Sequence, residues 1–423
     1  MLTRPIRKIG LISCFNKPYP GKQGGIVAII VAIALPILIG FAGLALDLGK
    51  LFVTKTELQN AADACALSAA NELTGVTTQF ASAETAGIAT GQANKVFFQT
   101  AAVSLPANSA VSFSQTLNGA YSTQNSLTGL TTAQAALYKY VKCTATKSNI
   151  ANWLIQVLNL MPGITVANQQ AVAASAVATL APSQNSCSLL PIGVCSTAVN
   201  ATTPIGTWVA GIIAPGTATL SGSFRWVDLN GSSGSASAIA AILSGNVCLA
   251  PPSPGATLTA SGFKASNRDD YNTRFGLKHG SADGVPDYTG YSYYPVASSW
   301  PSGNNAYSDF VSERTSNTAY QGDAKSGIKL TGGTGSTTIP ITKGSSRRLM
   351  VAPVVDCSTM KLSASSPTFA CLLLLHPMQT QGASNFTMYL EYLGDANKES
   401  PCNQTGLAGS STSTGPVVSA LVQ

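Results

Sequence analysis

The sequence has few charged residues and few histidines. Asp, Glu, Lys and Arg make up 10% of its 423 residues, whereas an ordinary soluble protein has about 25%. Residues 85–227 contain no Asp or Glu. The two histidines, His279 and His376, form no H-E-x-x-H motif, and no C-x-x-C pair is present. Zinc enzymes, zinc knuckles and thioredoxin-like redox proteins therefore lack their characteristic motifs.

Motifs for nucleotide binding and hydrolysis are missing as well. The sequence has no G-x-x-x-x-G-K-[ST], no G-x-G-x-x-G and no G-x-S-x-G, which argues against P-loop, Rossmann and hydrolase folds. We predict no catalytic residue, no metal ligand and no cofactor. An exported hydrolase whose Ser–His–Asp triad is assembled from distant residues stays an alternative, because neighbours in space are invisible in a sequence.

The net charge of +7 is concentrated at the N-terminus. Five basic residues and no acidic residue precede Gly24, and the remainder has 19 basic against 17 acidic residues. This balance leaves no basic face, so we expect no nucleic-acid partner.

An uncharged run of 23 residues, from Gly24 to Leu46, follows the basic segment and ends at Asp47. A helix of about 20 apolar residues spans the bilayer core, and short basic flanks stay cytoplasmic. The run therefore predicts a transmembrane helix over 24–47 with residues 1–23 in the cytoplasm. We take the following residues as membrane-anchor candidates: Gly25, Ile29, Ile33, Pro36, Ile37, Gly40, Leu44 and Asp47.

Cleavage of this run is the alternative to a retained anchor. The small residues at 42–45 resemble a signal-peptidase site, although the apolar run is longer than the 7–15 residues or so of a signal peptide. Prepilin-type cleavage near Gly24 or Gly25 is the other route, but type IV pilins carry a Glu shortly after the cut, where this chain has Ile29 and Ile30.

The helical pattern continues beyond the apolar run. Residues at alternating steps of four and three define one helix face, and no Gly or Pro interrupts the sequence between Lys50 and Leu73. We expect one helix over 25–73, roughly 70 Å long at 1.5 Å per residue, with Pro36 as a tolerated kink. The packing face of its outer half comprises Leu48, Leu51, Leu58, Ala62, Cys65 and Ala69.

The remainder of the chain divides into two regions with different sequence patterns. The patterns predict helices over 81–99 and 149–160 and strands over 110–113, 137–146 and 164–180, although 167–178 could also be helical. From residue 182, short apolar runs alternate with Gly, Ser, Asn and Pro, which is typical of a β-rich domain, with a short helix over 231–243 and an edge strand over 416–422. The expected fold class is α+β, and the expected domains are 1–23, 24–47, 48–180 and 181–423.

The predicted membrane topology divides the nine cysteines into two groups. Cys14 lies on the expected cytoplasmic side, and the other eight lie outside, where an even number in an oxidising compartment predicts disulfides. The disulfide candidates are Cys65, Cys143, Cys187, Cys195, Cys248, Cys357, Cys371 and Cys402. The sequence does not determine how the six from Cys187 onward pair.

Acidic and aromatic residues cluster between 269 and 323. Exposed aromatics beside acids suit sugars, Ca²⁺ or a partner protein, while packing of the aromatics within their own domain is the alternative. The acidic spacing does not fit an EF-hand loop, so a calcium site is disfavoured. The partner-surface candidates are Tyr288, Tyr291, Tyr293, Tyr294 and Trp300.

The N-terminal helix resembles a known signature. The apolar run ending in D-x-G, followed directly by L-Q-N-A-A-D-A-x-A-L, is similar to the N-terminal region of TadG-like proteins of bacterial Tad (Flp) pilus-assembly systems. The matching residues are Ala28, Leu35, Pro36, Gly40, Gly43, Leu44, Asp47, Gly49, Leu58, Gln59, Asn60, Ala61, Ala62, Asp63, Ala64, Leu67 and Ala70. Residues 140–178, 271–276 and 347–357 resemble later parts of the same family.

The resemblance implies a pilin-like α+β module after the transmembrane helix and a disulfide-containing β-rich domain beyond it. Family members usually have Ala where Cys65 stands, so a disulfide from Cys65 to Cys143 on the predicted strand is expected, with a free thiol as the alternative. Larger members carry a von Willebrand A-type domain with a D-x-S-x-S metal site. Residues 356–360 lack its second serine, so we expect no such site.

The sequence is therefore interpreted as a non-enzymatic, single-pass protein of the bacterial inner membrane, with its bulk in the periplasm or cell envelope. Its expected work is assembly or anchoring of a Tad/Flp-type pilus through contacts with other pilus-assembly or secretion components. The N-terminal helix could also join copies of the chain into a homo-oligomer. A surface adhesin released by cleavage of this helix is the alternative to an anchored protein.

Overall fold

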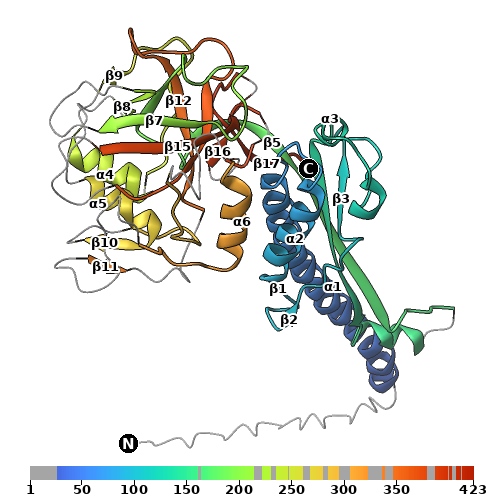
Figure 1. The fold of residues 1–423 in the computed structure, drawn as a ribbon. Helices are drawn as coiled ribbons and strands as arrows, with labels where there is room; N and C mark the ends of the chain where they lie inside the picture. Colours follow the sequence, from blue (N-terminus) through green and yellow to red (C-terminus); the bar gives the residue numbers. More distant parts are fainter. Residues whose placement is uncertain are drawn as a thin grey trace, which may run out of the picture. The chain divides into compact units, whose positions relative to one another are not determined.

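One long helix, α1, runs from Ile26 to Asn71 (Figure 1). The helix expected over 25–73 is thus confirmed apart from its ends. It terminates where the amides of Glu72 and Leu73 bond three residues back and Gly75 adopts φ 77°, a left-handed conformation that stops a helix. The computed structural model describes residues 26–160, 163–213, 222–229, 235–245, 247–260, 267–279, 284–294, 305–322, 336–338, 346–378, 386–398, 400–402, 406–410 and 412–423.

The elements after α1 combine short helices with a sheet. The helices are α2 (Gln79–Gln92), α3 (Thr132–Ala135) and the 3-10 turns η1 (Gln124–Leu127) and η2 (Ile155–Leu160). The strands are β1 (Lys95–Val96), β2 (Ala101–Ala102), β3 (Val111–Ser114), β4 (Tyr140–Ala151) and β5 (Gln169–Ser186). β3, β4 and β5 lie next to one another in a five-stranded sheet.

Two expected helices differ from the structure. The helix predicted over 81–99 ends at Gln92, and Lys95–Val96 form the short strand β1. The helix predicted over 149–160 is replaced by the end of β4, which continues to Ala151, and by the 3-10 turn η2. The strand expected from residue 164 begins only at Gln169. The apolar spacing in this segment is compatible with a helix, but Asp47 of α1 holds the backbone here through hydrogen bonds to its amides.

Small side chains dominate the core between α1 and the sheet. Ala61, Ala62, Ala66, Ala69 and Ala70 of α1 are fully buried, and they cluster with the sheet alanines Ala145, Ala174, Ala176 and Ala178. Because alanine projects little beyond the backbone, this stripe lets the helix lie close against its neighbours.

The C-terminal part of the chain is built mainly from strands. Its strands are β6 (Ile192–Cys195), β7 (Trp208–Ile213), β8 (Phe224–Asp228), β9 (Thr259–Ala260), β10 (Leu277–His279), β11 (Ser336–Thr338), β12 (Leu349–Asp356), β13 (Lys361–Leu362), β14 (Phe369–Leu374), β15 (Phe386–Asp395), β16 (Gly406–Ala408) and β17 (Val417–Leu421). Its helices are α4 (Ala236–Ser244), α5 (Asn267–Asn272), η3 (Thr273–Phe275) and α6 (Tyr307–Thr315). The β-rich character expected from the sequence is confirmed.

An eight-stranded sheet organises this β-rich part. Its strand order is β7-β15-β14-β12-β6-β8-β9, and β13 also pairs with β12. β12 and β6 run parallel, while β12, β14, β15 and β7 are antiparallel neighbours. Every residue of β14 is buried, which explains why its sequence is a continuous apolar run rather than an alternating one. Separate apolar clusters include alternate residues of β12 and β14 and thus lie on opposite faces of the sheet.

The last strand of the chain returns to the sheet next to α1. β17 pairs antiparallel with the second half of β5, from Pro182 opposite Val417 to Ala178 opposite Leu421, and β16 pairs further along β5. The edge strand expected near the C-terminus is thus a partner of β5.

Contacts within the chain define two compact units. One comprises residues up to Phe52 with Ser148–Ala171, and the other comprises Val53–Lys147 with Val172–Gln423. The domain boundaries expected from the sequence stay predictions.

Candidate functional site: the buried faces and carboxylates of helix α1

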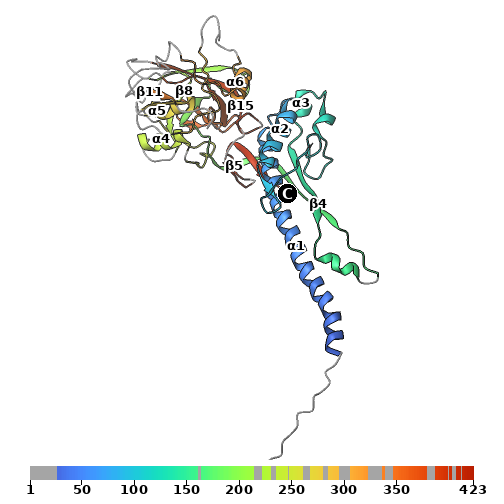
Figure 2. The same cartoon turned by 90° about the horizontal axis from the view of Figure 1, so that it is seen from below.

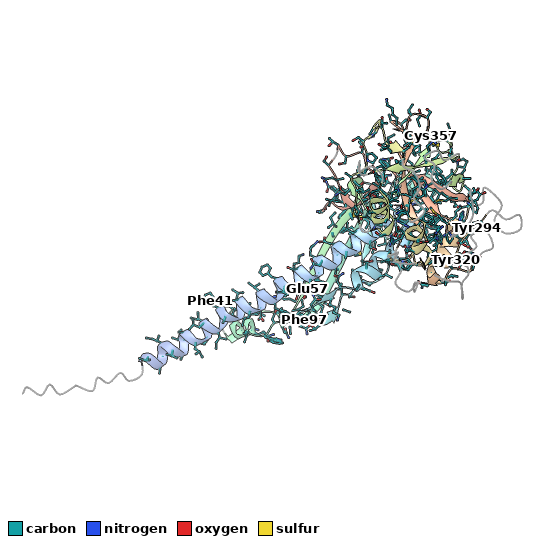
Figure 3. The ribbon with its side chains drawn as sticks, turned by 90° about the vertical axis from the view of Figure 1, so that its left-hand side faces the viewer. Phe41, Glu57, Phe97, Tyr294, Tyr320 and Cys357 are labelled. Carbon is teal, nitrogen blue, oxygen red and sulfur yellow. A yellow bond between two sulfur atoms is a disulfide. The ribbon has the colours of Figure 1, made fainter. Side chains whose placement is uncertain are left out.

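The first part of α1 exposes its large apolar side chains. Ile29, Ile33 and Leu44 are 61%, 62% and 38% exposed, and Figure 3 labels Phe41, which is 67% exposed, on the same stretch. The helix is long and apolar enough to cross a membrane. Of the other anchor candidates, Pro36 lies within the helix, and Gly25 lies outside the described residues.

One face of this apolar stretch is covered. Gly40, Gly43 and Asp47, at successive helical turns, are buried. A Cβ atom added at Gly43 would lie 2.7 Å from the backbone carbon of Leu154, a distance that real Cβ atoms do not adopt. The loop between β4 and β5 therefore lies directly on the helix, and glycine at 43 is required for that approach.

Asp47 joins this loop to the helix. Its Oδ2 atom accepts hydrogen bonds from the amides of Trp153, Leu154 and Ile155 at 3.2, 3.1 and 3.0 Å. These amides lie at the N-terminal end of η2, where backbone N–H groups have no partner within the helix. A carboxylate suits this position because the N-terminus of a helix attracts negative charge.

Lys50 adds two contacts one turn further along. Its Nζ donates to the carbonyl oxygen of Ala151 at 2.9 Å and lies 4.6 Å from the centre of the Trp153 ring. On α1, the Asp47 carboxylate thus binds backbone amides of the loop, and the Lys50 ammonium group binds the last carbonyl of β4.

A second buried carboxylate, Glu57, holds a backbone turn of unusual geometry. Phe97, Phe98 and Gln99 have φ values of 64°, 54° and 61°, a left-handed conformation that is unfavourable for residues other than glycine. Glu57 accepts hydrogen bonds from the amides of Phe98 (3.1 Å) and Gln99 (3.2 Å) and from the Gln99 side chain (3.1 Å). Figure 3 shows Glu57 on α1 and Phe97 beside it.

The packing residues predicted on α1 are buried only in the part of the helix from Leu58 onward. Leu58, Ala62, Cys65 and Ala69 are completely buried, whereas Leu48 is 41% exposed and Leu51 is half-buried. Helix α2 contributes Gly87, where an added Cβ would lie 3.0 Å from the carbonyl oxygen of Cys65.

Four disulfides use the eight cysteines predicted to be oxidised. Cys65 of α1 is bonded to Cys143 of β4, and Figure 2 shows these two elements side by side. The other pairs are Cys187–Cys248, Cys195–Cys357 and Cys371–Cys402. Cross-links of this kind reduce the entropy of the unfolded chain and thereby stabilise the folded one.

The predicted aromatic partner surface is only partly exposed. Tyr293 and Tyr294 are 0% and 8% exposed, so these two are not available to a partner. Tyr293 donates to Asp309 at 3.0 Å, and Tyr294 stacks on His376 with ring centres 4.0 Å apart. The alternative interpretation, in which the aromatic side chains pack within their own domain, therefore applies to both tyrosines.

The other partner-surface candidates differ among themselves. Tyr288 is 40% exposed and has the Arg314 guanidinium 5.1 Å from its ring centre. Tyr291 is half-buried, and Trp300 lies outside the described residues.

Buried arginines connect two segments that the sequence singled out, 271–276 and 347–357. Asp287 is completely buried and accepts from the amides of Arg347 (2.8 Å) and Arg348 (2.9 Å) and from Nε of Arg314 (3.1 Å). Arg274 and Arg348 donate to main-chain carbonyls, and burial lowers the pKa of Arg274 to about 9 and that of Arg348 to about 10. These hydrogen bonds connect loops of the β-rich part, and no sequence motif predicts the cluster.

Both ring nitrogens of His376 have backbone partners. Nε2 accepts from the amide of Tyr389 at 3.1 Å, and Nδ1 lies 3.0 Å from the carbonyl oxygen of Pro377. These partners require a neutral ring with its proton on Nδ1. Among the residues that the structure describes, no three His, Cys, Asp or Glu side chains lie close enough together to hold a metal ion.

Glu391 is a buried carboxyl group in the sheet of the β-rich part. It accepts from the indole N–H of Trp208 (2.8 Å) and from the amides of Ala306 (2.7 Å) and Tyr307 (3.2 Å). Burial raises its pKa to about 7, although these hydrogen bonds act in the opposite direction.

Comparison with known families agrees with the N-terminal signature. Residues 24–72 match the family model described as putative Flp pilus-assembly TadE/G-like, which confirms the resemblance inferred from the residues of this segment. The match spans α1, with the glycine face, Asp47, Glu57 and the small-residue stripe. No curated protein and no solved structure matches the chain.

We predict that Gly43→Ala releases the loop from α1. The added Cβ would lie 2.7 Å from Leu154, and overpacking of this kind costs about 1–3 kcal/mol. Hydrogen exchange at the amides of residues 153–155 should accelerate about tenfold or more. Gly49→Ala is the matched control, because its Cβ meets nothing within 4 Å. Equal exchange in the two variants would contradict the contact.

We predict that Glu57→Ala destabilises the left-handed turn over 97–99. Removing the carboxylate leaves amides without an acceptor, at a cost of about 1–3 kcal/mol. Glu57→Gln keeps one acceptor oxygen and should lie between wild type and Glu57→Ala. Amide exchange at residues 98 and 99 measures the effect. Asn60→Ala, on an exposed position of the same helix, is the control, and a Glu57→Ala variant indistinguishable from it would disprove the role.

We predict that Glu391 titrates near neutral pH and makes the fold less stable as pH rises. Its pKa is raised from 4.5 to about 7, so between these values the folded state holds a proton that the unfolded state has lost. The resulting stability is complete below pH 4.5 and is lost as pH rises through about 7, a change on the order of 3 kcal/mol.

Trp208 fluorescence reports this titration directly, because the indole N–H is bonded to the Glu391 carboxyl. Glu391→Gln should remove both the fluorescence transition and the dependence of unfolding on pH. A transition that persists in this variant would assign it to another group.

Proposed function

We propose that this chain is a non-enzymatic, membrane-anchored protein of a Tad/Flp-type pilus system, acting in pilus assembly or anchoring through protein–protein contacts. The observation that carries the proposal is the family match, which covers α1 from end to end. The exposed apolar side chains of the first part of this helix support an anchor in the inner membrane.

The arrangement around α1 supports binding rather than chemistry. The buried acids of this region accept hydrogen bonds from backbone amides, and the buried histidine of the β-rich part has backbone partners at both ring nitrogens. Groups used in this way hold loops in place. We infer that the basic segment before residue 24 stays in the cytoplasm and that the disulfide-bonded part lies in the periplasm or beyond it.

The small-residue face of α1 suggests how the exported part is organised. The helix packs its alanine stripe on a sheet, with a disulfide from Cys65 to Cys143, an arrangement that we propose is pilin-like. The β-rich part would then present a surface to other pilus-assembly or secretion components.

Deletion of the gene in its own bacterium tests the pilus role. We expect loss of Tad-type surface pili and their recovery with the wild-type gene. A variant cut so that the chain begins after residue 47, carrying a cleavable signal peptide, keeps the exported part and removes the anchor. We expect it to be exported without restoring pili. Normal piliation in the deletion strain would rule out the role.

Alkaline extraction of membranes tests the anchor independently. The full chain should remain in the membrane pellet, with its eight exported cysteines protected from thiol reagents until reduction. Recovery of a soluble form that begins near residue 46 would instead support a secreted adhesin.

A further inference from the structure

We propose that the loop between β4 and β5, residues 152–168, is a second membrane-contacting element. It would lie in the lipid interface at the far end of the transmembrane part of α1, with Trp153, Leu154 and Ile164 in contact with lipid. The inference rests on the proposed membrane anchor and adds a lipid-binding surface to it.

The contacts with α1 determine where this loop lies along the helix. Gly43 is in contact with Leu154, and Asp47, one turn further, binds the amides of residues 153–155. At 1.5 Å per residue, Gly43 lies roughly 26 Å and Asp47 roughly 32 Å from Ile26 along the helix. Because the hydrocarbon core is about 30 Å thick, the loop lies where the core gives way to the headgroups.

Three apolar side chains among the described residues of the loop are exposed. Trp153 is 73% exposed, Leu154 is 40% exposed and Ile164 is 42% exposed. Residues 148–171 contain no charged residue. Exposed tryptophan and aliphatic side chains at this depth are typical of a membrane interface, where one side of the indole ring contacts lipid and the other contacts water.

Three polar side chains of the loop, those of Asn152, Gln156 and Asn159, bind backbone groups inside it. Asn152 donates to the carbonyl oxygen of Ala167 at 2.8 Å, and Gln156 donates to that of Asn152 at 2.7 Å. Asn159 donates to the carbonyl oxygen of Val166 (3.2 Å) and accepts from its amide (2.6 Å). With Asp47 binding three further amides, backbone groups that water would otherwise solvate have protein partners, as irregular backbone close to lipid requires.

Lys50 marks the polar side of the same boundary. Its ammonium group lies over the Trp153 ring and on the carbonyl of Ala151. A lysine at the end of an apolar helix, with its ammonium group over an exposed tryptophan ring, is typical of the boundary between the hydrocarbon core and the headgroups. The occupant that fits the loop is therefore the lipid of the membrane that α1 spans, rather than a separate protein.

Fluorescence quenching of the full-length chain in vesicles of phosphatidylcholine and phosphatidylglycerol tests this placement. The emission of Trp153 is the difference between wild type and Trp153→Phe, a conservative change at an exposed position. Lipids brominated on the upper acyl chain quench only indoles in contact with lipid, and acrylamide preferentially quenches indoles in water. Trp208, isolated in the same way with Trp208→Phe, is the control within the β-rich part.

We expect brominated lipid to remove most of the Trp153 emission and acrylamide to remove little, with the Trp208 emission unaffected by brominated lipid. Quenching of Trp153 by acrylamide alone would place the loop in water and overturn the inference. Protection from both quenchers would overturn it as well, since a protein surface, such as a second copy of the chain, would then cover the loop.

Flotation of the same vesicles separates this inference from the anchor. If the chain floats with the vesicles but Trp153 is in water, the inference fails and the anchor stands. If the chain does not float, the anchor fails and the inference fails with it.

Discussion

Buried carboxylates that accept hydrogen bonds from backbone amides determine the loops of this protein. Asp47, Glu57, Glu84, Asp287 and Glu391 all bind amides of segments far away in the sequence. Only 17 acidic residues are present in the whole chain, so a substantial share of its acidic side chains serves this purpose. The reason is physical: a buried N–H needs an acceptor, and an ionised acceptor makes a stronger bond than a carbonyl.

This dependence explains which elements can be predicted from the sequence. Helix α1 is predictable because its periodicity, its apolar run and the stop at Gly75 are all local signals. The segment 149–160 is not, because its apolar spacing fits a helix while Asp47, more than a hundred residues away, holds its amides. A contact over that distance leaves no spacing that can be read along the chain.

The features of the candidate site also divide into those that the sequence predicts and those that depend on the fold. Eight cysteines in an oxidising compartment predict disulfides, and the structure adds the pairing, which depends on how the strands are arranged. The composition of the acidic and aromatic segment suggests a surface, but Tyr293 and Tyr294 are core residues. The composition of a segment does not show which way its side chains point. The burial of a tyrosine in a loop-rich domain therefore cannot be predicted from composition.

The glycine face of α1 also constrains how copies of the chain could associate. Small residues such as glycine often allow transmembrane helices to approach each other closely, and Gly40 and Gly43 lie on one face of α1. Here that face is buried, and the backbone at Leu154 occupies the space beside Gly43. A homo-oligomer through α1 therefore has to pack on the exposed faces that carry Ile33 and Leu44, where large side chains keep the helix axes further apart. The same reasoning ties Gly43 to the loop that it contacts: a change that frees the loop also exposes this face of α1 for association.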